Sequence, residues 1–437
     1  MKDFAHLDRR DFLKILAAGC VLSVLPSGMT IAAATSTQKA RIVILGCGLA
    51  GLAAAHRLRR QLPNAEITLI DAKKEHNYQP GYTLLATGVW HDTGKVKADN
   101  ADLIPKNTTW LQEAAAAIYP DQNRVETDAN RSVPYDFLIV ATGLRLGYEK
   151  IEGLDTAAFG QKGVGSVYHS PEVALATWQA MDAYRKQGGR AVMTLAPTDM
   201  KCAGAPLKMT FMLADRLREA GMQKNAGIDF FAAKTAIFSV PVVAKNVLDR
   251  WEQLEIAPKV HYNRILNGVD MEAKVAHFTD ENGNASREDY DFIHVVPPMF
   301  SPAPIFDNPA LRNDNGWLAV NKETLQHTRY PNIFGLGDIN GTPRGKTAAT
   351  VKKSAPVVVH NLINTLNGKA PDALFDGYTS CPMLLRQGSA MLVEFNGAGE
   401  LTPTIPLVDP LQESYFAWYL EEVMLKPAYM TVLRGRV

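Results

Sequence analysis

The apolar and polar positions predict alternating buried strands and helices along most of the chain. Residues 41–45 and 67–70 are short, β-branched apolar runs, typical of strands buried in a parallel sheet. Between them, residues 52–62 have helical periodicity and end before Pro63. Comparable apolar runs follow at 135–143, 189–196 and 332–338. This alternation predicts an α/β fold.

A glycine-rich turn joins the first predicted strand to the first predicted helix. Gly46, Gly48 and Gly51 have the G-x-G-x-x-G spacing, and Asp71 ends the next strand about twenty residues later. The glycines allow a tight turn and a close approach to a pyrophosphate, while the carboxylate can accept ribose hydroxyls. We therefore expect a bound dinucleotide here, with Cys47 as a buried bystander.

Two further turns identify the dinucleotide. They are Ala141-Thr142-Gly143 and Gly337-Asp338, each at the end of a buried strand. In this order the three turns resemble those of flavoproteins with two dinucleotide-binding domains, which implies FAD. The resemblance also implies that Asp338 binds the ribityl chain and that a helix beginning near Lys346 points its N-terminus at the flavin.

The middle of the chain should form a second Rossmann-like domain. We expect the FAD domain at 40–150 and 291–365, the second domain at 151–290 and a C-terminal region at 366–437. After the strand at 189–196, the loop that would bind nicotinamide dinucleotide lacks its glycines. Residues 197–206 contain two prolines and a cysteine instead. A nicotinamide site is therefore not expected.

Two isolated cysteines stand in specific contexts. Cys202 lies in Lys-Cys-Ala-Gly-Ala-Pro, and Cys381 lies in Thr-Ser-Cys-Pro. Either alone reads equally well as a small buried apolar residue. Together with His-Asn-Tyr-Gln-Pro at 76–80 and Val-Val-Pro-Pro-Met at 295–299, they resemble the sulfide:quinone oxidoreductases, in the branch with two essential cysteines.

The resemblance implies a mechanism and its partners. Cys202 and Cys381 would form a redox pair that oxidises sulfide over a non-covalently bound FAD, with the role of each cysteine left open. Lys208 is a third candidate catalytic residue, because its charge would favour the thiolate. Electrons would pass to a membrane quinone. The implied quinone-site residues are Pro298, Phe395, Tyr415 and Phe416.

The C-terminal stretch 415–433 is dense in aromatic and long apolar side chains and closes with Arg434 and Arg436. It is too short to span a bilayer, so we expect a helical segment that contacts the membrane surface. The alternative is a helix packed on its own protein or on a partner in a homo-oligomer.

The N-terminus resembles a twin-arginine signal peptide over residues 1–34. Arg9-Arg10 precede Phe-Leu-Lys and an apolar run, and Ala34 ends a small-residue cleavage site. This leader predicts export of the folded protein to the periplasmic face of the inner membrane.

Composition narrows the function classes. The chain has 46 Lys and Arg against 45 Asp and Glu, so its net charge gives no overall attraction to nucleic acid. None of the 4 cysteines has metal-ligand spacing, which predicts no metal site. Three other functions remain open: a sulfide dehydrogenase subunit that reduces a c-type cytochrome, a type II NADH dehydrogenase, and a redox-silent flavin-binding subunit.

Overall fold

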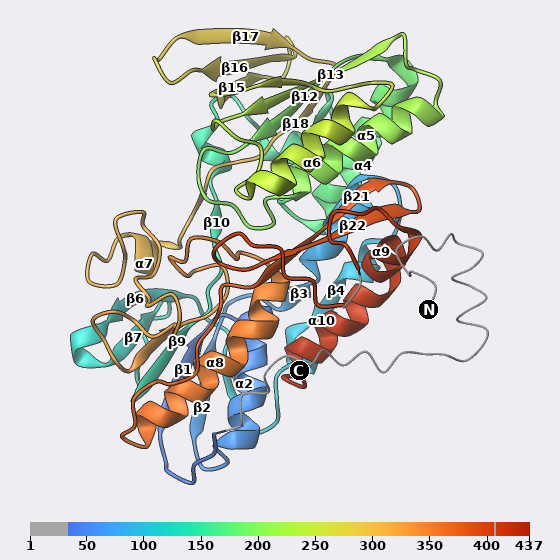
Figure 1. Cartoon of the computed structure of the whole chain (residues 1–437). Coiled ribbons are helices and arrows are strands. Elements are labelled where there is room, and N and C mark those ends of the chain that lie inside the picture. The colour runs from blue at the N-terminus through green and yellow to red at the C-terminus, as the bar shows by residue number, and fades with distance from the viewer. Residues whose placement is uncertain (1–33, 406–407) are drawn as a thin grey trace, which may run out of the picture.

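A computed structural model describes residues 34–405 and 408–437 (Figure 1). The predicted leader lies outside these residues, apart from Ala34. Two large parallel sheets, one in each half of the molecule, carry helices and smaller antiparallel sheets. The predicted class, two Rossmann-like domains with a C-terminal helical segment, is confirmed.

The first large sheet has the strand order β20-β9-β1-β2-β5, and every pair is parallel. Its strands are β1 (Arg41–Leu45), β2 (Glu66–Ile70), β5 (Thr109–Leu111), β9 (Phe137–Val140) and β20 (Ile333–Gly335). Successive side chains of β1 enter different apolar clusters, with Ile42 and Ile44 in one and Val43 and Leu45 in the other. Both faces of the sheet are therefore covered, as the uninterrupted apolar runs predict.

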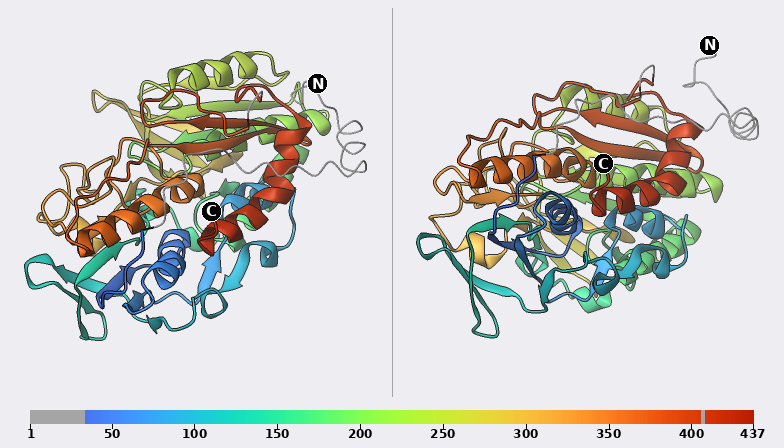
Figure 2. Two further views of the ribbon diagram at one scale, coloured as in Figure 1. Left: turned by 60° about the horizontal axis from the view of Figure 1, so that its bottom comes forward. Right: turned by 90° about the horizontal axis from the view of Figure 1, so that it is seen from below.

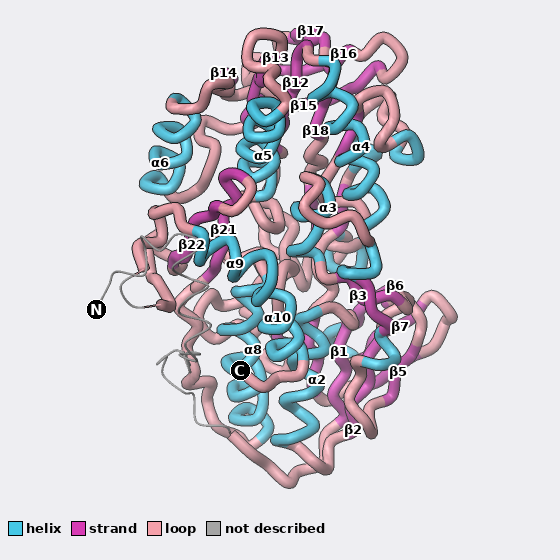
Figure 3. The backbone as a smooth tube through the Cα atoms, turned by 90° about the vertical axis from the view of Figure 1, so that its right-hand side faces the viewer, coloured by secondary structure: helices cyan, strands magenta, loops and turns pink. Residues whose placement is uncertain are grey.

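Helices α2 (Leu49–Gln61) and α8 (Ala348–Leu366) pack side by side on one face of this sheet (Figures 1 and 3). The inner side of α2 is rich in alanine and leucine, which lets the helix approach the strands closely. The antiparallel sheet β6 (Ala115–Tyr119), β7 (Arg124–Thr127) and β8 (Ser132–Pro134) adds Ile118 and Val125 to the cluster on the other face.

The second large sheet has the order β11-β18-β12-β13-β14, again all parallel. Its strands are β11 (Val164–Gly165), β12 (Gly189–Leu195), β13 (Ala226–Ala232), β14 (Lys259–His261) and β18 (Phe292–His294). Helices α4 (Pro171–Gln187), α5 (Ala205–Glu219) and α6 (Pro241–Glu252) lie on one side (Figure 1). The hairpin sheet β15 (Ile265–Asp270), β16 (Val275–Thr279) and β17 (Ala285–Asp289) lies on the other.

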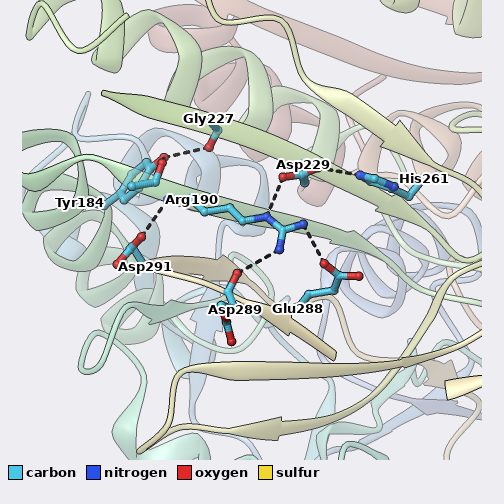
Figure 4. A network of polar contacts seen from close by, with 9 residues as sticks. Tyr184, Arg190, Gly227, Asp229, His261, Glu288, Asp289 and Asp291 are labelled. Carbon is cyan, nitrogen blue, oxygen red and sulfur yellow. Dashed lines mark hydrogen bonds and ion pairs between the residues drawn. The ribbon is translucent and has the colours of Figure 1, made fainter. Parts of the chain in front are cut away.

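A charged network centred on Arg190, near the amino-terminal end of β12, crosses the second sheet (Figure 4). Arg190 Nε donates to Asp229 Oδ2 at 2.8 Å, and Arg190 Nη2 pairs with Glu288 at 2.8 Å. His261 Nε2 lies 2.6 Å from the other Asp229 oxygen. The network joins β12, β13, β14 and β17. The opposite, carboxyl ends of the strands remain for loops, which is where ligands bind in such sheets.

Short paired segments connect the two halves. Strands β10 (Arg145–Leu146) and β19 (Met299–Phe300) pair where the chain leaves the first domain and where it returns. The short helix α7 (Ala303–Phe306) follows β19, and the pair β3 (Glu75–Asn77) and β4 (Lys97–Asp99) flanks α3 (Tyr82–Ala86) in the first half.

The C-terminal region begins with a β-hairpin, β21 (Thr379–Arg386) and β22 (Ser389–Phe395), that packs on α5 and α8. Helix α9 (Tyr415–Tyr419) then continues through a π-helical turn, Leu420–Met424, into α10 (Leu425–Leu433). Helix α10 lies against α2 (Figures 2 and 3). No helix among the described residues is both long and apolar enough to cross a bilayer.

One domain boundary differs from the one predicted, and one element was not predicted. β18 pairs with β12, so the second domain extends to His294 and not to 290. The run at 291–296 is apolar throughout, and such a run does not show which of two sheets will take the strand. The hairpin in the C-terminal region was also unforeseen, because aromatic content alone does not separate strand from helix.

Candidate functional site

The glycine turn after β1 is closed tightly against the neighbouring strand. Gly46 has φ +106°, and a Cβ there would lie 2.4 Å from the carbonyl oxygen of Ala141. A Cβ on Gly51 would lie 1.8 Å from the oxygen of Gly46. Neither position tolerates a side chain, because the contacted atoms are backbone. These two glycines therefore fix the close packing of the turn and α2.

The outer side of the same turn faces open space. A Cβ on Gly48 or on Gly143 would meet no atom within 4 Å. Thr142 Oγ1 is buried there without a hydrogen-bond partner. Asp71 accepts hydrogen bonds from the Cys47 and Lys73 amides at 2.7 and 2.9 Å. An unpartnered hydroxyl beside a glycine-lined opening at the carboxyl ends of the strands fits a dinucleotide.

The third predicted turn places a carboxylate and a helix start nearby. Helix α8 has Thr347 as its N-cap, whose hydroxyl accepts from the Thr350 amide at 3.2 Å. Burial raises the pKa of Asp338, and the charges of Lys346 and Lys201 oppose that rise. Since the α8 N-terminus is favourable for negative charge, these residues fit the electron-rich part of a reduced flavin.

Lys346, just before α8, is held by two backbone carbonyls of the preceding turn. Its ammonium donates to the carbonyls of Asp338 and Asn340 at 2.7 and 2.9 Å and lies over the Trp317 ring. Burial lowers its pKa to about 8. Its own carbonyl accepts from the Cys202 amide at 2.9 Å. Lys346 thus joins the Asp338 turn to the cysteine loop.

Cys202 lies in a strained backbone conformation in the loop between β12 and α5. Its φ is +45°, a left-handed conformation that is uncommon for a residue with a side chain. Besides the bond to Lys346, its carbonyl accepts from the Tyr168 hydroxyl at 3.0 Å and from the Ala205 amide at 2.8 Å. These three bonds hold the strained residue in place.

The fold brings Cys381 to Cys202 from a distant part of the sequence. Cys381 is in β21, and its thiol lies within hydrogen-bonding reach of the sulfur of Cys202. Both are free cysteines in this structure. A Cβ on Gly204 would lie 2.3 Å from Cys381 Sγ, so only glycine allows this approach at the start of α5. The predicted cysteine pair is thus adjacent in space.

The two cysteines share one cavity with the start of α8. The cavity has a volume of about 260 Å³ and is lined by both cysteines, by Lys346 and Thr347, and by Phe238 and Phe395. Its walls come from both Rossmann-like halves and from the C-terminal hairpin. A small sulfur nucleophile in this cavity would contact the cysteines and the α8 N-terminus together.

A buried ion pair lies beside the cysteines. Lys208 Nζ on α5 is 3.3 Å from Glu421 Oε1 in the π-helical turn, and the two side chains are 3% and 1% exposed. Burial lowers the pKa of Lys208, but Glu421 and both cysteines raise it further, so that it lies above its usual value. The ammonium stays charged next to the sulfur atoms. The second oxygen of Glu421 is buried without a partner.

The groups around the two cysteines shift the pKa values of their thiols in opposite directions. The hydrogen bond from Cys381, followed by the charge of Lys208, lowers the pKa of Cys202 although burial opposes it. The same hydrogen bond and burial raise the pKa of Cys381. One proton therefore leaves the pair readily while the second is retained. By contrast, burial raises the pKa of Cys47, which makes it an unreactive thiol.

The four residues predicted for a quinone lie in three segments of the structure. Phe395 lines the cysteine cavity at one end of β22, where it packs edge-on against Phe238. Tyr415 lies near the hairpin turn at the other end, 3.8 Å from the Cβ position of Gly388. Phe416 is also in α9, half-buried, while the carbonyl of Pro298 accepts from Gly147. The C-terminal stretch 415–433, called the tail below, therefore lies apart from the cavity that contains the two cysteines.

Three residues of the site were not found from the sequence. They are Gly204, Tyr168 and Glu421. The glycine in Cys-Ala-Gly-Ala indicated that another group comes close to the backbone at this position. Nothing in the sequence showed that this group is the sulfur of Cys381. Glu421 belongs to an apolar tail, where an acidic residue reads as surface. Only the π-helical turn directs it inward.

Comparisons with known proteins agree with this geometry. Residues 40–175 match the family described as pyridine nucleotide-disulphide oxidoreductase. The mitochondrial sulfide:quinone oxidoreductase of Dictyostelium discoideum is 34% identical over 422 residues, covering 94% of this chain and 92% of that protein. The mouse mitochondrial enzyme is 31% identical over 93% of this chain and 89% of its own.

Solved structures show the same fold. The sulfide:quinone oxidoreductase of Aquifex aeolicus superposes with a TM-score of 0.74 at 22% identity, over 90% of this chain and 92% of that chain. A chain in the mitochondrial ATP synthase of Tetrahymena thermophila superposes with a TM-score of 0.79 at 20% identity, over 92% and 98%. At these identities the likeness establishes the architecture alone.

Proposed function

Because the chain belongs to the sulfide:quinone oxidoreductase family, we propose that Cys202 and Cys381 oxidise hydrosulfide and that the electrons pass through FAD to a membrane quinone. The enzyme is an oxidoreductase that acts on a sulfur donor. The observation that carries the proposal is the contact of the two cysteines in a cavity bordered by the starts of α5 and α8.

The first step follows from the cysteine geometry. In the oxidised pair, hydrosulfide attacks one sulfur of the Cys202–Cys381 disulfide, and the bond between the two sulfurs breaks. The attacked cysteine becomes a persulfide that keeps the hydrosulfide proton, and the other leaves as a thiolate. The ammonium of Lys208 lies beside both sulfurs and stabilises that thiolate. A small nucleophile then removes the sulfane sulfur.

FAD, when bound, would accept the electron pair from the cysteines and pass it to the quinone. The residues that would hold it are Gly46, Gly48, Gly51, Asp71, Ala141, Thr142, Gly143, Gly337 and Asp338. Binding would be non-covalent, because two of the three described cysteines form the pair and the third, Cys47, is buried and unreactive.

A nicotinamide donor has no comparable support. The loop between β12 and α5 is longer than the glycine turn after β1, and its space is taken by the cysteines. A quinone as electron acceptor is favoured by the tail, which exposes apolar side chains in the π-helical turn and in the first half of α10. We also propose that the enzyme acts at the periplasmic face of the inner membrane, to which the twin-arginine leader would direct it.

The test is an anaerobic titration of the purified, FAD-loaded protein with sulfide while the flavin absorbance is recorded. Sulfide should bleach the flavin, and a short-chain quinone should restore it. Cys202→Ser and Cys381→Ser should each abolish bleaching, whereas the matched control Cys47→Ser should bleach as the unmodified protein does. Recovery with cytochrome c but not with quinone, or bleaching by NADH but not by sulfide, would contradict the proposal.

A further inference from the structure

A second cavity lies at the far end of α2, away from the glycine turn. It has a volume of about 550 Å³ and is lined by His56 and Arg60 of α2 and by Arg434, Gly435 and Arg436, which follow α10. Gly435 has φ +62°, and a Cβ there would lie 2.8 Å from Arg57 Cγ. Close packing of the chain end on α2 therefore forms this cavity.

Positive charges line this cavity without acidic partners. Among the described residues, Arg57, Arg60, Arg434 and Arg436 take part in no ion pair. Arg60 donates instead to the carbonyls of Arg434 and Gly435. Arg57 Nε is buried without a partner. Such an arrangement stores repulsion that a bound anion would relieve.

The acidities of these groups agree with this repulsion. Burial lowers the pKa of His56, the contact of its Nε2 with the Leu103 carbonyl at 2.9 Å opposes this, and the charges of Arg60, Arg434 and Arg436 lower it further. Burial and then Arg60 lower the pKa of Arg57 to about 10, while burial and Arg436 lower that of Arg60. No carboxylate raises any of these values. The cavity therefore has the electrostatic character of an unfilled anion site.

An exposed apolar face leads to this cavity along the tail. Val423 and Met424 are 45% and 43% exposed, and Pro427 and Ala428, about one helical turn further on, are exposed as well. The opposite side of the tail is buried through Trp418, Glu421 and Tyr429. One helical segment thus offers apolar side chains to its surroundings and, at its end, a group of arginines.

From this arrangement we propose that the cavity formed by His56, Arg60, Arg434 and Arg436 binds the phosphate of an anionic phospholipid when the apolar face of the tail lies on a bilayer. Apolar side chains at the acyl boundary with arginines at the headgroups are the usual order in an interfacial helix. Guanidinium groups bind phosphate oxygens in pairs, which suits this lining. The inference rests on the proposed function, because a membrane quinone requires membrane contact.

The experiment uses the full-length, FAD-loaded protein in vesicle flotation. Phosphatidylcholine vesicles with and without phosphatidylglycerol are compared for the unmodified protein and for Arg434→Gln/Arg436→Gln. We expect binding to favour phosphatidylglycerol, and the double variant to bind these vesicles roughly 30-fold more weakly. The control Lys224→Gln/Lys259→Gln removes the same charge from exposed positions of the second domain and should bind as the unmodified protein does.

Two outcomes would overturn the inference. One is equal binding of the double variant and its control to phosphatidylglycerol vesicles. The other is equal binding of the unmodified protein to vesicles with and without phosphatidylglycerol while inorganic phosphate, but not sulfate at equal ionic strength, raises its thermal midpoint, which would identify a site for free phosphate. Sulfide-dependent reduction of a soluble short-chain quinone separates the two proposals, because it should be unchanged in the double variant. If the unmodified protein lacks that activity yet prefers anionic vesicles, the proposed function fails and the lipid site stands.

Discussion

The two Rossmann-like halves use the same strand–turn–helix unit for different chemistry. After β1, three residues lead into α2, and glycines keep the turn close to backbone and open to a dinucleotide. After β12, nine residues lead into α5, and they include Cys202 in a left-handed conformation. One glycine survives there, Gly204, and it makes room for a sulfur atom and not for a phosphate.

The comparison shows that a helix N-terminus can stabilise two different negative groups, a pyrophosphate and a cysteine thiolate. In the first half the start of α2 faces the predicted pyrophosphate. In the second half the start of α5 faces Cys381, whose thiolate the Gly204 amide favours. The second turn also depends on a charge pair formed with a distant part of the chain, Lys208 with Glu421. Among the residues that the structure describes, no ion pair supports the first turn, which is held instead by the hydrogen bond from the Cys47 amide to Asp71.

Breaking that charge pair should have the largest effect. Lys208→Met leaves Glu421 buried without its partner and should lower the free energy of unfolding by about 3–5 kcal/mol. Lys208→Met/Glu421→Met replaces both charges with apolar groups and should recover most of this stability, because no lone buried charge remains. Chemical denaturation of both variants measures the difference. Sulfide oxidation should stay low in both, since each lacks the ammonium beside the cysteines.

A double variant as unstable as Lys208→Met alone would show that the pair itself, and not the lone carboxylate, stabilises the fold. Normal sulfide oxidation in the stable double variant would remove Lys208 from the reaction. Glu421→Gln serves as a further control, because it keeps the shape of the side chain and removes only its charge.

Gly204→Ala should have the next largest effect. The new Cβ would lie 2.3 Å from Cys381 Sγ, so the sulfur or the start of α5 must move. We expect a loss of about 1–3 kcal/mol in unfolding free energy and a strong loss of sulfide-dependent flavin bleaching. FAD binding should be kept, because the glycine turn after β1, which we expect to bind the pyrophosphate, is unchanged in this variant.

Gly227→Ala is the matched control, since a Cβ in that part of β13 meets no atom within 4 Å. Equal bleaching in the two variants would mean that the Cys381 sulfur can approach without the glycine. In that case the contrast between the two turns would not depend on Gly204.

Much of the first half could be predicted from the sequence because its determinants are local. The apolar run 41–45, the glycine spacing and Asp71 all fall within one βαβ unit, where spacing alone fixes geometry. The position of the cysteine pair, by contrast, depended on family resemblance. Cys202 and Cys381 meet only because the C-terminal hairpin packs on α5, and no local pattern records that packing.

The tail shows most clearly what a sequence pattern cannot predict. Its aromatic density predicted an interfacial segment, and the structure shows one face exposed and the other buried. The π-helical turn adds a residue to the helical repeat and so turns Glu421 inward. A pattern based on 3.6 residues per turn cannot anticipate that rotation. The two phenylalanines and the tyrosine that were grouped as one quinone site are divided between two places.

Gly48→Ala tests whether the glycine turn after β1 binds the dinucleotide. A Cβ there meets no protein atom within 4 Å, so the unfolding free energy of the FAD-free protein should change little. The methyl group would occupy space that the pyrophosphate needs, and we expect FAD affinity to fall about tenfold. Fluorescence titration of the FAD-free protein measures this. Unchanged affinity would mean that the dinucleotide does not approach this glycine.

The smallest expected effect is on the acidity of Cys202. The hydrogen bond from Cys381 is the main cause that lowers its pKa, so Cys381→Ala should raise it, with Lys208 still present to limit the change. Because only the thiolate is alkylated, the pH midpoint for iodoacetamide labelling of Cys202 should move up by about one pH unit. Labelling sites are read by peptide mass spectrometry, and Cys47→Ala should leave the midpoint unchanged. A midpoint that does not move in Cys381→Ala would show that Lys208, and not the second thiol, sets the acidity of the loop that replaced the glycine turn.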